Sequence, residues 1–254
     1  VYARRKDRPL HIDTFVPNNL NSLKAVVMLV HGGGWKKGDR SKEHTKAKWF
    51  SNRGFIVVCP EYRLSGEALF PAAIHDLKDA IYWTREHALE WGGQPDRIIL
   101  MGFSAGAHLV ALAATAGPEA GLDISESQKQ SNSIAACIVV AGPSITNDER
   151  AFLEARKPES NYQLFLGDLP ENIPAIYEKA SPAHWVTGNE PPMLFITEGN
   201  PSAHNTIRSK LDKLGIQNEI FNLTGGLHSE WNWEPWFTPT MEVTETFIHS
   251  TITH

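Results

Sequence analysis

Short apolar runs alternate with longer amphipathic segments along most of the sequence. The runs that indicate buried strands are residues 25–30, 55–60, 98–101, 135–140 and 193–197, with further strands expected at 10–16 and 219–223. Continuous apolar runs of this length are typical of strands that are covered on both faces. Strands that alternate with helices in this way usually pair in parallel. The sequence therefore predicts an α/β fold with a mainly parallel central sheet flanked by helices on both faces.

The helices between these strands are expected at residues 42–52, 71–91, 104–116, 205–214 and 241–252. The second of them has Pro71 at its start and Gly92 just past its end, which are residues that favour helix boundaries. No repeat or break in composition divides the chain, so we expect a single domain over residues 1–254. Residues 142–192 are the exception, because repeated prolines predict an irregular segment there. Long loops of this kind usually form a lid or a binding wall.

The charge and hydropathy of the chain exclude several classes of protein. A formal net charge of -5 argues against a nucleic-acid partner, which would require a basic face. No apolar run approaches the length that spans a bilayer, so no membrane partner is expected. The first residues lack the apolar core of a signal peptide. We favour a secreted or periplasmic location with the leader absent from this chain, and a cytoplasmic location is the alternative. The oligomeric state stays open.

One serine stands at a sharp boundary between an expected strand and an expected helix. Residues 98–108 read IILMGFSAGAH, so Ser104 lies between Gly102 and Gly106. A strand that turns abruptly into a helix needs glycine on either side of the exposed residue, because a Cβ there would collide with the backbone. This pattern is typical of a nucleophile elbow. The alternative is a strand-to-helix turn in which the serine only caps the helix.

A second motif, HGGGW at residues 31–35, follows the strand expected at 25–30. Three glycines leave backbone N–H groups accessible, and the tetrahedral intermediate of acyl transfer needs such donors for its negative oxygen. The motif lacks the Lys-Ser/Thr ending of a phosphate-binding loop. No residues stand at metal-ligand spacing either, so we expect neither a metal nor a cofactor. An HGGG loop ahead of a G-x-S-x-G elbow indicates catalysis by Ser104 much more specifically than either motif alone.

Four stretches resemble a known family. MLVHGGGWKKGDR, VVCPEYRLS, FPAAIHDLKDAIYW and RIILMGFSAGAHLVALAA are similar to the α/β-hydrolase esterases of the acetyl-esterase and feruloyl-esterase type, related to the hormone-sensitive-lipase group. The resemblance runs from about residue 10 to the C-terminus. It implies the α/β-hydrolase fold and a serine hydrolase with Ser104 as the nucleophile. The amides of Gly33, Gly34 and Ala105 would then form the oxyanion hole.

A serine nucleophile requires a base to accept its proton, and an imidazole is the usual one. His228 follows the last expected strand in LTGGLH, where two glycines let the loop bring a side chain over the strand ends. The family order of serine, acid and histidine agrees, so we predict His228 as the base. We expect His31 to shape the glycine loop and His108 to pack within the elbow helix. The histidines expected at the surface are His11, His44, His75, His184, His204 and His249.

The acid departs from the family pattern. Relatives usually carry Gly-x-x-Asp after the strand at 193–197, but here Ser202 stands three residues after Gly199 and no aspartate is near. Loss of the residue that orients the histidine can cost about ten-thousandfold in kcat, so an efficient enzyme would need a substitute. We predict Glu198, whose side chain starts at the carboxyl end of the strand and is longer than that of aspartate. Asp148, in the loop after the strand at 135–140, is one alternative, and the absence of any acid is another.

Aromatic residues crowd the sequence after His228, which reads SEWNWEPWF. We expect Trp231, and Trp35 in the glycine loop, to bind substrate, with core packing as the alternative for the cluster. The resemblance implies a small-molecule or oligosaccharide ester as substrate. Our leading hypothesis is a serine carboxylic ester hydrolase that removes acetyl or feruloyl groups through an acyl-enzyme intermediate. The alternatives are an arylformamidase-like amide hydrolase and a catalytically weakened binding protein on the same fold.

Overall fold

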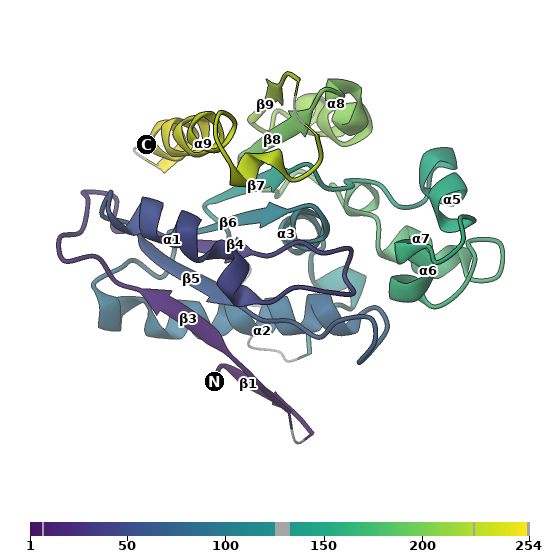
Figure 1. The fold of residues 1–254 in the computed structure, drawn as a ribbon, viewed down its shortest axis with the longest axis horizontal. Helices are drawn as coiled ribbons and strands as arrows, with labels where there is room; N and C mark the ends of the chain where they lie inside the picture. Colours follow the sequence, from purple (N-terminus) through teal and green to yellow (C-terminus); the bar gives the residue numbers. More distant parts are fainter. Residues whose placement is uncertain (7, 125–132, 226, 253–254) are drawn as a thin grey trace.

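The computed structural model describes residues 1–6, 8–124, 133–225 and 227–252, and its centre is a seven-stranded sheet (Figure 1). The strand order is β3-β5-β4-β6-β7-β8-β9, with β3 antiparallel to β5 and the other neighbours parallel. The strands are β3 (Ile12–Phe15), β4 (Val26–Val30), β5 (Ile56–Pro60), β6 (Ile98–Phe103), β7 (Ala136–Val140), β8 (Met193–Glu198) and β9 (Asn218–Leu223). The prediction of an α/β fold with a mainly parallel sheet is therefore confirmed.

Helices cover both faces of this sheet. They are α1 (His44–Ser51), α2 (Ala72–His87), α3 (Ala105–Thr115), α8 (Asn205–Lys213) and α9 (Phe237–Ile252). Successive side chains of a strand point to opposite faces. Val26, Met28 and Val30 accordingly belong to the core beneath α2, α3 and α8, whereas Val27 and Leu29 belong to the core beneath α1 and α9. Burial on both faces explains why the strand sequences are continuously apolar.

The N-terminal edge of the fold is more broken than predicted. A short antiparallel ribbon of β1 (Ala3–Arg5) and β2 (Arg8–Leu10) precedes β3, so the strand expected at residues 10–16 begins two residues later. At the other end of the chain, α9 begins four residues before its predicted start at 241. No helix in the described parts of the chain combines the length and the hydropathy that crossing a bilayer requires.

The segment at residues 142–192, where we expected irregular structure, is helical in part. It contains three short helices, α5 (Glu149–Ala155), α6 (Asn161–Leu166) and α7 (Pro174–Lys179), which Figure 1 shows grouped at one end of the sheet. Asp148 and Ser160 cap the first two, because their side chains accept hydrogen bonds from backbone amides of the first turn. Pro174 occupies the first turn of α7, where a missing N–H costs nothing. Pro182 likewise begins a 3-10 turn, so two of the prolines in this segment start helical elements.

Parallel pairing brings the carboxyl ends of several strands to one edge of the sheet. Val30 at the end of β4 pairs with Gly102 in β6, and Phe103 at the end of β6 pairs with Val140. Glu198 is the last residue of β8. The glycine motif follows the end of β4, Ser104 follows the end of β6, and Glu198 ends β8. The topology therefore gathers these residues at one edge of the sheet.

Candidate active site

Ser104 occupies a sharp turn between β6 and α3. Its backbone has φ 52° and ψ -116°, a conformation that costs a residue with a side chain on the order of 1–3 kcal/mol. The Ser104 amide donates to the Val140 carbonyl at 2.8 Å, which ties the turn to β7. Its side chain makes no capping hydrogen bond to α3. The turn has the strand-turn-helix context of a nucleophile elbow, and the capping alternative does not describe it.

The glycines on either side of Ser104 are required by backbone packing. A Cβ built on Gly102 would lie 2.2 Å from the Gly106 carbonyl oxygen, and one built on Gly106 would lie 2.2 Å from the Val30 carbonyl oxygen. Contacts this short do not occur, so any larger residue would displace β4, β6 or α3. The G-x-S-x-G pattern thus reflects three backbones in direct contact at the place where the serine is exposed.

Three side chains from distant parts of the sequence form a continuous hydrogen-bonded chain. Ser104 Oγ lies 3.0 Å from His228 Nε2, and His228 Nδ1 lies 2.8 Å from Glu198 Oε2. A carboxylate can only accept, so Nδ1 carries the proton and Nε2 is free to accept from the serine hydroxyl. The structure therefore brings together the three residues that the sequence nominated, with the imidazole in the tautomer that a general base requires.

The second oxygen of Glu198 is also used. Glu198 Oε1 accepts the backbone N–H of Ser229 at 3.0 Å, so one carboxylate holds both the ring and the backbone of the histidine loop. The glutamate side chain is only 11% exposed, whereas that of His228 is 57% exposed. Asp148, our alternative acid, lies elsewhere and accepts the Ala151 amide at 2.7 Å as the cap of α5. Of the two carboxylates, Glu198 is the one in contact with His228.

The glycine loop lies directly against the elbow. A Cβ on Gly32 would lie 2.6 Å from the Phe103 carbonyl oxygen and 3.1 Å from Ser104 Cβ. Gly33 and Gly34 have φ values of 135° and 60°, which side-chain-bearing residues rarely adopt. Both line a cavity together with Ser104. Ala105 is the first residue of α3, where an amide has no acceptor within the helix. The residues predicted for the oxyanion hole therefore share a cavity with Ser104 or directly follow it in the chain.

His31, the first residue of the glycine motif, is buried and fixes the start of this loop against Tyr62. Its ring stacks on Tyr62 with 4.3 Å between centroids, and the Tyr62 hydroxyl donates to the His31 carbonyl at 2.8 Å. Burial lowers the pKa of His31 to about 4, so the ring is neutral at pH 7. This agrees with the predicted shaping role for His31.

A buried lysine that sequence reasoning missed holds the histidine loop from the opposite side. Lys46 Nζ, in α1, donates to Glu43 Oε2 at 2.7 Å and to Asn232 Oδ1 at 2.6 Å. Asn232 Nδ2 in turn donates to the Ser229 carbonyl at 2.8 Å. The Lys46 and Glu43 side chains are 2% and 3% exposed. A hydrogen-bonded path therefore connects α1 to the residue whose amide binds Glu198.

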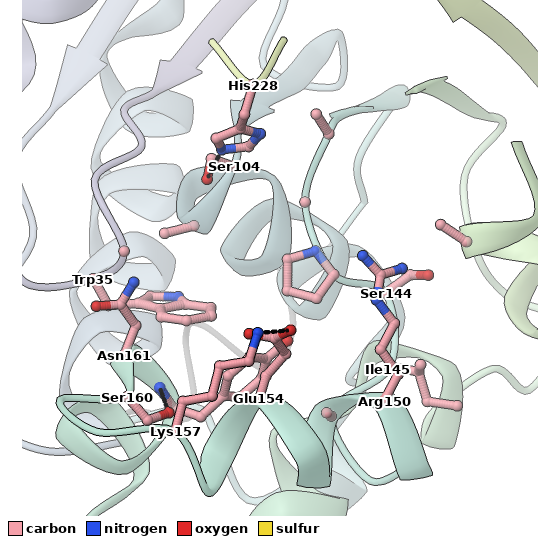
Figure 2. A pocket seen from close by; sticks show the side chains of 18 of the residues that line it. Trp35, Ser104, Ser144, Ile145, Arg150, Glu154, Lys157, Ser160, Asn161 and His228 are labelled. Atoms are coloured by element: carbon pink, nitrogen blue, oxygen red, sulfur yellow. Dashed lines mark hydrogen bonds and ion pairs between the residues drawn. The ribbon is translucent and has the colours of Figure 1, made fainter. Parts of the chain in front are cut away.

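Two cavities meet at Ser104. The first, of about 640 Å³, is lined mainly by residues 141–162 and also by Trp35, Thr197 and His204. The second, of about 800 Å³, is lined by the glycine loop, residues of α1 and the loop that follows His228. Figure 2 looks into the first cavity, with Ser104 and His228 on one side and Glu154, Lys157 and Asn161 on the opposite side. An ester carbonyl at Ser104 would have space on both sides.

The two predicted substrate-binding tryptophans line these cavities but are mostly buried. Trp35 is 4% exposed and stacks on Phe165 with 4.7 Å between ring centroids. Trp231 is 2% exposed and packs edge-on against His228 at 5.1 Å. The exposed indole is that of Trp233, at 64%. Trp35 and Trp231 therefore combine core packing with a place in the cavity wall, and the free aromatic face belongs to Trp233.

His204 is buried, so our expectation of a surface position for it was wrong. Its Nδ1 lies 2.9 Å from Ser144 Oγ, and both residues are 2% exposed at the wall of the first cavity. Burial lowers its pKa to about 4, so the ring is neutral at pH 7. The sequence signal for this position is weak, because burial arises from β7, β8 and the 3-10 turn at Pro201–His204 folding together.

No group of three or more histidine, cysteine or carboxylate side chains among the described residues is arranged to hold a metal ion.

A serine at a strand-helix turn, hydrogen-bonded to a histidine and then to a carboxylate beside a glycine-rich loop, defines the class of α/β hydrolases on this mainly parallel sheet. Residues 12–208 match the BD-FAE family model. The chain belongs to this family of α/β-hydrolase esterases, which confirms the resemblance found in the sequence.

Known proteins agree with this assignment. The esterase LipQ of Mycobacterium tuberculosis is 32% identical over 175 residues, which cover 68% of this chain and 41% of LipQ. The probable isoprenylcysteine alpha-carbonyl methylesterase ICMEL1 of Arabidopsis thaliana is 36% identical over 115 residues, 43% of this chain and 24% of ICMEL1. A butyrate-bound structure of the Thermogutta terrifontis esterase Est2 has a TM-score of 0.81 at 23% identity, covering 98% of this chain and 92% of that one. The chain spans less than half the length of these two curated relatives.

Proposed function

We propose that this chain is a serine carboxylic ester hydrolase that acts through an acyl-enzyme intermediate. The observation that carries the proposal is the unbroken hydrogen-bonded chain from Ser104 Oγ through His228 to Glu198. Family membership supports it, because the family comprises esterases. A binding protein would have no need for a strained serine whose hydroxyl lies within hydrogen-bond distance of an imidazole.

The first half of the proposed reaction forms an ester on Ser104. The serine Oγ attacks the substrate carbonyl carbon while His228 Nε2 accepts its proton, and Glu198 stabilises the imidazolium that results. The carbonyl oxygen becomes an oxyanion, which accepts hydrogen bonds from the amides of Gly33, Gly34 and Ala105. Donors of this kind are worth about 3–4 kcal/mol each in comparable sites. The intermediate then collapses, and His228 returns its proton to the departing alkoxide to release the alcohol.

The second half removes the acyl group. A water molecule donates its proton to His228 Nε2 and attacks the acyl carbon, and the same amides stabilise the second oxyanion. Collapse expels Ser104 Oγ, which regains the proton from His228, and the carboxylic acid leaves. No external oxidant, metal or cofactor enters either half.

For the substrate we propose a small acyl group, acetyl or feruloyl, esterified to a carbohydrate. Two features of the first cavity support an aromatic acyl group as large as feruloyl. Trp35 and Tyr162 supply aromatic surface, and Ser144 with His204 supplies buried polar groups that could contact a phenol. Its volume of about 640 Å³ exceeds what acetyl alone would fill.

Hydrolysis of p-nitrophenyl acetate by the wild type and by Ser104→Ala tests the proposed reaction. We expect turnover by the wild type and a loss of at least about a thousandfold in the variant, because removing a triad member leaves only the residual effect of binding and the oxyanion hole. Equal rates would refute Ser104 as the nucleophile. Comparing the rates of hydrolysis of methyl ferulate, acetylated xylan and N-formylkynurenine then distinguishes the feruloyl-esterase, acetyl-esterase and arylformamidase hypotheses.

A further inference from the structure

The two cavities differ in charge although they meet at the same nucleophile. Gly34, Lys36, Ser104, Asn161 and His228 line both of them. An ester whose carbonyl sits at Ser104 must therefore place its acyl half in one cavity and its alcohol half in the other. If the two cavities differ in charge, the acyl half and the alcohol half of the substrate can carry different charges.

The second cavity is positively charged. Its wall carries four lysines and one carboxylate, Glu43, which is already paired with Lys46. Lys36, Lys37 and Lys42 are exposed, and no ion pair among the described residues involves them. The wall of the second cavity thus has an excess of positive charge, although the formal net charge of the whole chain is -5. Clefts lined by one sign of charge concentrate ligands of the opposite sign.

The first cavity is not positively charged in this way. Its wall has the cations Lys36, Arg150 and Lys157 and the carboxylates Asp148, Glu154, Glu159 and Glu198. Lys157 pairs with Glu154 at 2.6 Å, as the dashed line in Figure 2 shows. Opposite charges on this wall offset one another, so only the second cavity favours an anionic group.

The position of the general base assigns the alcohol half to the second cavity. The departing oxygen takes its proton from His228 Nε2, so the alcohol half lies beside His228 and next to the loop that continues from it. Ser229, Trp231, Asn232 and Trp233 of that loop all line the second cavity. The first cavity is instead walled mainly by residues 141–162, and it is left for the acyl half. Trp233, 64% exposed, offers an indole face to a ring on the alcohol half.

We propose that the alcohol half of the natural ester is a ring that carries an anionic oxygen group, bound in the second cavity by Lys37 and Lys42, with Lys36 where the two cavities share their lining. This inference rests on the proposed ester hydrolysis and adds the chemistry of the leaving group to it. The anion on a sugar or aromatic ring is attracted to the lysine ammonium groups while the ring lies over Trp233.

A ratio of two specificity constants tests this proposal. The probes are 4-acetoxybenzoate, whose alcohol half carries a carboxylate, and the neutral 4-acetoxybenzamide. The ratio of their kcat/KM values in the double variant Lys37→Gln, Lys42→Gln is compared with the wild-type ratio, so that the different leaving-group reactivities cancel. We expect the ratio to fall about fivefold, the effect of losing two solvent-exposed ion pairs. The wild-type ratio should also fall as salt rises, because exposed charges are screened.

The matched control is Lys48→Gln, which removes an exposed lysine of α1 that lies outside both cavities. Its ratio should equal that of the wild type. A second pair, methyl 4-carboxybenzoate and methyl benzoate, places the carboxylate on the acyl half. A lysine effect confined to this second pair, or an unchanged ratio for both pairs in an enzyme that hydrolyses p-nitrophenyl acetate, would overturn the inference. Absence of all hydrolysis would instead contradict the proposed function.

Discussion

Replacing Lys46 by methionine removes an ammonium group with two roles, which are to stabilise the fold and to position the histidine loop. The group is buried, binds the Glu43 carboxylate and holds Asn232, and it also lies 4.3 Å from the centroid of the Phe103 ring. Removing it leaves the Glu43 charge buried without its cation. Breaking a buried pair from one side costs about 3–5 kcal/mol, so Lys46→Met should lower the free energy of unfolding by roughly that amount.

The same substitution releases the histidine loop. Lys46 donates a charged hydrogen bond to Asn232, and such bonds are worth about 1.5–3 kcal/mol. If that energy holds Ser229 and His228 in the hydrogen-bonded arrangement, the fraction of molecules with an aligned imidazole falls by about tenfold to a hundredfold. We therefore expect kcat for p-nitrophenyl acetate to fall by that factor, with a smaller change in KM, because substrate binding does not require the aligned base.

A double variant distinguishes stability from positioning. In Lys46→Met, Glu43→Leu both charges are absent, and replacing a complete buried pair by apolar side chains is often neutral or stabilising. Urea unfolding should then show stability restored to within about 1–2 kcal/mol of the wild type, while kcat stays low because Asn232 is still unanchored. Asn232→Leu, which keeps the ion pair, should reproduce the loss of kcat. Recovery of kcat together with stability in the double variant would refute the positioning role.

Two further predictions follow from the site and the core. Glu198→Asp shortens the side chain by one methylene and should lower kcat at least tenfold, because the carboxylate can no longer reach both His228 Nδ1 and the Ser229 amide. Glu198→Gln should approach the ten-thousandfold loss of kcat known for triad amides. Equal kcat values in the wild type and both variants would contradict the role of Glu198 as the acid. Burial lowers the pKa values of His31, His108 and His204 to about 4, so the unfolded chain, whose histidines have pKa values near 6.5, binds more protons than the folded chain between these values. The free energy of unfolding should therefore level off above about pH 7.5 and fall as the pH decreases, by up to ~4 kcal/mol per pH unit between about pH 6 and 4.5. Urea unfolding at several pH values checks this, and His108→Gln should reduce the slope by about one third.

The features that could be predicted from the sequence are those with local physical causes. The buried strands could be identified because burial on both faces requires continuous apolar runs, as in β4 and β6. The elbow could be identified because Gly102 and Gly106 lie within two residues of Ser104, so the steric requirement is written in one short stretch. Glu198 could be nominated because it ends a predicted strand. Each of these inferences needed only neighbouring residues.

The features that were missed depend on contacts between distant residues. Lys46 and Asn232 are 186 residues apart, and a lysine at one position of an amphipathic helix carries no sign of burial. His204 is buried by tertiary packing, not by an apolar pattern around it. The helices at 142–192 were overlooked although Asp148 and Ser160 are favourable caps and Pro174 a favourable first residue. These cap signals compete in the sequence with repeated prolines, which favour turns and loops.

The position of the acid at the end of β8 changes what holds the site together. An aspartate in the loop after a strand depends on that loop for its position, whereas Glu198 is paired with Leu223 in the sheet register. Its carboxylate then binds the Ser229 amide, so the histidine loop is fixed to the sheet by the same group that orients the imidazole. The remaining freedom of that loop is restrained by Asn232 and Lys46 from α1. The alignment of His228 with Ser104 therefore rests on β6, β8 and α1, and the Glu198 carboxylate is positioned by the sheet and not by the loop that follows β8.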